Sequence, residues 1–111
     1  MTKMTPTQIK CIEEIKRKIN EARIAKDFDD YVLNVKRRTM RTSYYEDPAN
    51  YEWEREYYEN YKNGRVLVAH YGMPTLRALA KKGYVKDVEF GTHRSNIVID
   101  WVTLNEDMLE A

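Results

Sequence analysis

The sequence has little of what stabilises or anchors exported proteins. Cys11 is the only cysteine among 111 residues, so no internal disulfide can form and a reducing compartment is expected. No run of about 18 apolar residues is present, and the first residues lack the apolar stretch of a secretory signal. We therefore expect a soluble cytoplasmic protein that does not enter a membrane.

Groups that carry enzymatic chemistry are also scarce. The two histidines, His70 and His93, have no serine or cysteine beside them at the spacing of a nucleophile. The four glycines stand apart, at positions 64, 72, 83 and 91, and form no phosphate-binding loop. Cys11 lies in a helical pattern beside Ile12, which favours a structural thiol over a nucleophile. We expect no catalytic residue, no cofactor and no metal site.

Charge is unevenly distributed, although the net charge of the chain is only +1. Residues 1–41 hold eleven basic and six acidic side chains, and residues 42–63 hold two and six. The pattern then repeats. Residues 64–94 hold six basic and two acidic side chains, and residues 95–111 hold four acidic side chains and no basic one. Such blocks create strong local potentials if they fold onto different faces, and they cancel if they fold together.

Helical periodicity dominates the first third of the chain. Thr5 and Gln8 form a capping box, and apolar residues then recur every three or four positions, which predicts a helix over residues 5–25. A second helix is predicted over residues 27–38, because Asp27 can cap it and apolar residues again recur at helical spacing. The alternation of apolar side chains in residues 31–35 also fits a strand, and the sequence leaves that alternative open.

An aromatic helix is predicted over residues 48–62. Asp47 and Pro48 form its start, and Asn63 with Gly64 forms its end. Aromatic stripes on helices are more often core than contact, but burying five large aromatics of one helix is difficult in so small a domain. Exposed aromatics among its glutamates would make an acidic, tyrosine-rich protein interface, whose candidate residues are Tyr51, Trp53, Tyr57, Tyr58 and Tyr61.

The rest of the chain predicts a strand, a short helix and a hairpin. Leu76 and Leu79 face inward on the short helix, and Gly83 supplies the left-handed residue that ends it. The predicted fold class is α+β, a single domain over residues 1–111 with three to four helices and a small antiparallel sheet of two to three strands. The elements of this part are a strand over residues 65–70, a helix over 74–82, a hairpin over 84–104 and an acidic tail over 105–111.

The order strand, helix with a Leu-x-x-Leu-x-x-x-Gly ending, strand, polar loop, strand resembles small winged helix-turn-helix proteins over residues 65–104. The pattern departs from that family in one respect, because the family usually places two helices between the first strand and the hairpin. Here only one helix fits there, and the helix over residues 48–62 comes before the strand.

The resemblance implies that the helix over residues 74–82 lies in a major groove of DNA and that the hairpin tip reaches the neighbouring backbone or minor groove. The residues implied to contact nucleic acid are Thr75, Arg77, Lys81 and Lys82 on the helix and His93 and Arg94 on the hairpin. A further basic cluster, suited to phosphates through charge alone, is formed by Lys36, Arg37, Arg38 and Arg41.

Two functions follow from these features. The leading hypothesis is a winged-helix-like protein that binds duplex DNA as a transcriptional regulator, and as a homodimer that uses Trp53, Tyr57 or Tyr61 at its interface. The alternative is a protein-binding module of the phage or mobile-element type. Such a module would use the acidic, tyrosine-rich face of residues 48–62 to inhibit a host nucleic-acid enzyme, for example a CRISPR nuclease.

Overall fold

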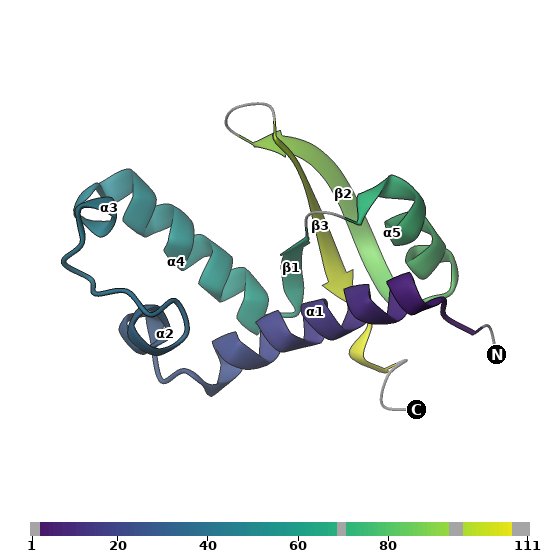
Figure 1. The fold of residues 1–111 in the computed structure, drawn as a ribbon, viewed down its shortest axis with the longest axis horizontal. Helices are drawn as coiled ribbons and strands as arrows, with labels where there is room; N and C mark the ends of the chain where they lie inside the picture. Colours follow the sequence, from purple (N-terminus) through teal and green to yellow (C-terminus); the bar gives the residue numbers. More distant parts are fainter. Residues whose placement is uncertain (1–2, 69–70, 94–96, 108–111) are drawn as a thin grey trace.

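The computed structural model describes residues 3–68, 71–93 and 97–107, with the backbone alone for residues 92–93 and 97–99. These residues form an α+β fold in which helices pack on a three-stranded antiparallel sheet (Figure 1). The helices are α1 (Pro6–Ile24), α2 (Phe28–Asn34), α3 (Ser43–Glu46), α4 (Pro48–Lys62) and α5 (Gly72–Lys81), and the strands are β1 (Arg65–Val68), β2 (Val85–His93) and β3 (Ile97–Leu104).

Helix α1 begins at the capping box. The backbone N–H of Gln8 donates to the hydroxyl of Thr5 at 3.2 Å, and the backbone N–H of Thr5 donates to the side chain of Gln8 at 3.1 Å. One face of the helix is then buried, including Cys11, Ile15 and Ala22, each fully inaccessible to solvent. The periodicity of residues 5–25 thus corresponds to a helix that packs its apolar face along the whole body of the protein.

Helix α2 is shorter than the predicted helix over residues 27–38. Asp27 caps it by accepting from the backbone N–H of Asp30 at 2.8 Å. The helix ends at Asn34, because Arg37 takes a left-handed conformation with φ of 57° and turns the chain away. A strand over residues 31–35 would place Tyr31 and Leu33 on the same face. In the structure Tyr31 is buried and Leu33 is half exposed, as the helix requires.

Helices α3 and α4 meet at Asp47. The four residues of α3 carry no periodic pattern, and the sequence does not predict this helix. Asp47 caps α4 by accepting from the backbone N–H of Ala49 at 2.9 Å, with Pro48 in the first helical position. Gly64, with φ of 85°, ends the helix in the left-handed conformation that glycine adopts without steric cost and leads directly into β1.

The sheet has the strand order β1-β3-β2, with both pairs antiparallel. Strand β1 pairs only with residues 100–103 of β3, whereas β2 and β3 remain paired as far as His93 and Ile97. The hairpin therefore continues beyond β1 as a two-stranded ribbon, which extends away from α1 in Figure 1. A single helix, α5, connects β1 to β2, so α4 precedes the first strand as the sequence predicts.

Arg65 ties the three strands together. Its guanidinium donates to the carbonyl of Asp87 at 3.0 Å, to the hydroxyl of Thr103 at 2.9 Å and to the carboxylate of Glu89 at 2.7 Å. Asp87 lies in a β-bulge between Lys86 and Glu89 and has φ of 50°. A side chain from one edge strand thus crosses β3 and holds the irregular part of the other edge strand.

The hydrophobic core lies between α1, α4 and the inner face of the sheet, and α5 closes it at one end. Its fully buried side chains include Tyr58, Val66, Leu76, Leu79 and Val102. The described chain is elongated, with extents of 48 × 32 × 21 Å, and α1 runs along it from α5 at one end to α2 at the other (Figure 1). Features near α2 and near α5 are consequently far apart.

Candidate nucleic-acid interface

Helix α5 separates its apolar side chains from its charged ones. Leu76 and Leu79 are completely buried against the rest of the fold. Arg77 and Lys81 are exposed, and their four-residue spacing places them on the same side of the helix. Thr75, at the start of the helix, is half-buried. Since α5 contains no Asp or Glu, its outward face carries positive charge without an acidic neighbour on the helix itself.

Lys82 has a different role from Arg77 and Lys81. Its ammonium group donates to the carbonyl of Lys3 at 2.8 Å and to the side chain of Gln8 at 2.6 Å. The same Gln8 oxygen accepts from Thr5 in the capping box, so Lys82 joins the end of α5 to the start of α1. This side chain is half-buried and is occupied within the fold.

The hairpin lies beside α5 and contacts it through Arg77. The guanidinium carbon of Arg77 is 5.5 Å from the centre of the Phe90 ring on β2, a cation–π distance. The contact holds the base of the ribbon next to the charged side of α5. Phe90 is not among the predicted site residues. The sequence alone does not indicate which aromatic side chain of the hairpin contacts Arg77. The side chain of His93 and all of Arg94 lie outside the described residues.

The basic cluster of Lys36, Arg37, Arg38 and Arg41 lies in the segment that connects α2 to α3. All four side chains are exposed. Lys36 makes a 3.8 Å ion pair with Glu54 of α4, and the guanidinium of Arg38 lies 5.6 Å from the centre of the Tyr44 ring. In Figure 1 this segment and α5 occupy opposite ends of the molecule, so the structure does not bring the two predicted basic regions together.

The aromatic residues of α4 belong largely to the core. Tyr58 is 1% exposed and Tyr61 is 7% exposed, while Tyr51, Trp53 and Tyr57 are half-buried. Their aromatic partners come from distant parts of the chain. Between ring centres, Phe28 is 5.2 Å from Tyr51 and 5.7 Å from Tyr58, and Tyr31 is 5.0 Å from Tyr58. Trp101 is 5.6 Å from Tyr57 and 6.4 Å from Tyr61. The exposed side of α4 is instead its charged side, which carries Glu52, Arg55, Glu56 and Glu59.

Burial also changes the acidity of the core tyrosines. Desolvation, with a smaller contribution from the nearby Glu54 carboxylate, raises the pKa of Tyr31 to about 12. Desolvation likewise raises the pKa of Tyr61 far above its usual value, with the phenol of Tyr31 as the next cause. Both phenols therefore remain neutral at physiological pH.

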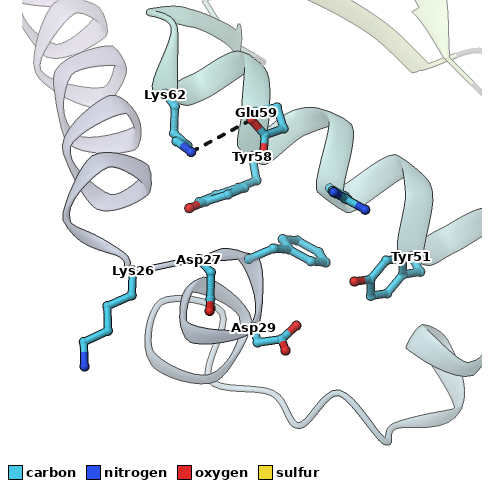
Figure 2. A pocket seen from close by; sticks show the side chains of 9 residues that line it. Lys26, Asp27, Asp29, Tyr51, Tyr58, Glu59 and Lys62 are labelled. Atoms are coloured by element: carbon cyan, nitrogen blue, oxygen red, sulfur yellow. Dashed lines mark ion pairs between the residues drawn. The ribbon is translucent and has the colours of Figure 1, made fainter.

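A hollow of about 310 Å³ lies between the start of α2 and the side of α4 (Figure 2). Three aromatic rings line it, those of Phe28, Tyr51 and Tyr58. Its remaining lining residues carry both signs of charge, with Lys62 3.9 Å from Glu59 across one side. The charged residues are Lys26, Arg55 and Lys62 and, opposite in sign, Asp27, Asp29 and Glu59. Since the two signs balance, the hollow has no electrostatic preference for an anion or a cation.

The structure also describes the environment of the cysteine and of the acidic side chains. Cys11 is fully buried, and desolvation followed by repulsion from Glu14 raises the pKa of its thiol to about 11. No group of three or more His, Cys, Asp or Glu side chains within the described ranges could hold a metal ion. Among the same residues, no helix has the length and apolar character needed to cross a membrane.

Comparison with known proteins assigns no family to the chain. No protein-family model matches it, and neither a curated protein nor a solved structure shows significant similarity to it. A function must accordingly be argued from the geometry and charge of the site itself.

Proposed function

We propose that this protein binds duplex DNA in a winged-helix-like manner, with α5 in the major groove and the β2–β3 hairpin along the adjacent backbone. The observation that carries the proposal is the outward face of α5, where Arg77 and Lys81 are exposed with no carboxylate on the same helix. The ten residues of α5 span about 15 Å, a length that a major groove accommodates.

Each element has a defined part in this binding mode. Arg77 and Lys81 supply the positive charge that neutralises phosphates or contacts base edges. Thr75, in the first turn, donates its hydroxyl to a phosphate close to the positive end of the helix dipole. The Arg77–Phe90 contact keeps the hairpin beside the helix, so that both elements meet the duplex in a fixed relation. A role as a transcriptional regulator is part of the proposal.

The alternative function, binding of a basic protein, is supported by the exposed glutamates of α4. Glu52, Glu56 and Glu59 surround one exposed cation, Arg55, so this side of α4 keeps a net negative charge that a positively charged partner could approach. The aromatic part of this predicted interface has less support, because Tyr58 and Tyr61 are buried in the core. Enrichment in aromatic anchors is what distinguishes strong protein interfaces, and we therefore favour DNA.

A homodimer is also part of the proposal, since a regulator that reads a palindrome needs two copies. Of the predicted interface residues, Trp53 and Tyr57 are half-buried and lie one turn apart on α4, whereas Tyr61 is buried in the core. Light scattering tests it directly. A mass near twice 13.3 kDa supports the dimer, and a mass near 13.3 kDa across micromolar concentrations contradicts it.

Fluorescence anisotropy with a labelled duplex of roughly 20 bp at low salt tests the DNA proposal. We expect the wild-type chain to bind, and we expect the double variant Arg77→Gln/Lys81→Gln to bind about tenfold more weakly. The matched control is Lys10→Gln/Lys16→Gln, which removes the same charge from two exposed positions of α1. The absence of binding by the wild type, or equal losses in both variants, would contradict the proposal.

A further inference from the structure

The basic cluster of residues 36–41 is separated from α5 by the length of the molecule. Helix α1 starts beside α5, where Gln8 accepts from Lys82, and it ends three residues before α2 begins. Its 19 residues span about 28 Å at 1.5 Å per residue. That distance exceeds the Debye length of about 8 Å at physiological salt, so the two positive regions act as separate sites.

The cluster retains free positive charge after its internal contacts are counted. Lys36 is paired with Glu54, and Arg38 is stacked on Tyr44. Arg37 and Arg41 are exposed and make no ion pair with any described residue. Four cations within six residues and no acid between them form a compact site for phosphate groups.

The backbone at Arg37 strengthens this interpretation. Its φ of 57° is a conformation that glycine or asparagine adopts more readily than arginine. The turn is fixed by the hydrogen bonds that close α2, from the N–H of Lys36 to the carbonyl of Tyr31 and from that of Arg38 to the carbonyl of Val32, both at 3.1 Å. A long cationic side chain therefore occupies a position where the fold alone would favour glycine.

The two basic regions also lie at opposite ends of the molecule. On α5, Arg77 lies over the Phe90 ring of β2, so its charge stands beside the hairpin. The 36–41 segment lies past α2 at the other end (Figure 1). A duplex that binds α5 reaches this segment only if it also runs along the length of α1.

We propose that residues 36–41 form a second phosphate-binding surface that holds a second DNA duplex, so that one chain bridges two DNA segments. This inference rests on the proposed function, since α5 is the surface that holds the first duplex. The group that this second surface recognises is the phosphodiester backbone of DNA. Binding there therefore does not depend on the base sequence.

A bridging assay tests the inference. One duplex is fixed to beads, protein is added at a concentration below that of the bead-bound duplex, and capture of a free fluorescent duplex is measured. We expect capture with the wild type and a loss of about fivefold or more with Arg37→Gly/Arg41→Gln. The glycine suits the left-handed turn at position 37, so this variant should keep the melting temperature of the wild type. Lys10→Gln/Lys16→Gln serves as the control of equal charge and should capture the free duplex as the wild type does.

The outcomes separate the two proposals. If the wild type binds no duplex at all, the proposed function and the bridging fail together. If it binds the bead-bound duplex but captures no free duplex, only the bridging fails. If Arg37→Gly/Arg41→Gln still bridges, the second duplex is held elsewhere, for instance by α5 of a second copy, and the assignment to residues 36–41 is overturned.

Discussion

Helices α4 and α5 are both amphipathic, but they place opposite chemistry on their exposed sides. Helix α4 buries Tyr58 and Tyr61 and exposes glutamates, whereas α5 buries Leu76 and Leu79 and exposes cations. The two helices lie on different sides of the sheet's first strand along the molecule (Figure 1). The exposed side of α4 is thus mainly acidic and that of α5 is basic. Elsewhere the charge blocks of the sequence partly neutralise each other, since Arg23 pairs with Glu106 and Lys36 with Glu54. Both helices lie beside the hairpin strands, because Tyr57 of α4 packs on Trp101 of β3 and Arg77 of α5 lies over Phe90 of β2.

The largest expected effect concerns the assignment of the aromatic side of α4 to the core. Tyr58→Ala should lower the free energy of unfolding by about 4 kcal/mol, because it removes a side chain that is 1% exposed. Tyr58→Phe should stabilise the protein by up to about 1 kcal/mol, because the buried hydroxyl has no hydrogen-bond partner among the described residues. Urea denaturation measures both changes. Unchanged stability in Tyr58→Ala would show that this aromatic side is not core.

A second effect should appear at alkaline pH. The pKa of Tyr31 is about 12 in the fold and near 10 in an unfolded chain, so the folded state binds this proton more tightly. The resulting stability is complete below pH 10 and is lost as the pH rises toward 12, by an amount on the order of 2 kcal/mol. Urea denaturation at several alkaline pH values measures the loss. Tyr31→Phe should make this dependence less steep, and Tyr61 and Cys11, whose pKa values are also raised, should account for what remains. An equally steep dependence in Tyr31→Phe would contradict the assignment.

The smallest effect concerns the acidic surface itself. Glu52→Gln/Glu56→Gln should raise the affinity for duplex DNA by less than about threefold, because these exposed carboxylates repel the phosphates of DNA bound at α5 only through a screened, long-range interaction. Anisotropy at physiological salt measures the change. A loss of affinity, or a gain as large as the loss in Arg77→Gln/Lys81→Gln, would mean that α4 contacts the duplex.

Local signals in the sequence predict much of the fold. Thr5, Asp27 and Asp47 cap the helices that follow them, and each cap depends on residues within three positions. Periodicity alone extends α2 too far, because the left-handed residue that turns the chain after it is an arginine and not a glycine. Helix α3, with only four residues, is too short to show a period.

The candidate site depends more on contacts between distant residues. Sequence spacing predicts Arg77 and Lys81 on the outer side of α5, where the structure exposes them. The same spacing cannot distinguish Lys82, because its partners Lys3 and Gln8 lie more than 70 residues away. The sequence also does not predict the burial of Tyr58 and Tyr61, because the rings that cover them, Phe28 of α2 and Trp101 of β3, come from distant parts of the chain.

The salt dependence of duplex binding tests the central claim most directly. Removing one protein–phosphate interaction should reduce the slope of log K against log salt by about 0.9, so Arg77→Gln/Lys81→Gln should flatten the wild-type slope by nearly 2. Lys10→Gln/Lys16→Gln should keep the wild-type slope. A slope that is the same in the wild type and in Arg77→Gln/Lys81→Gln would contradict the claim that the exposed cations of α5 neutralise DNA phosphates.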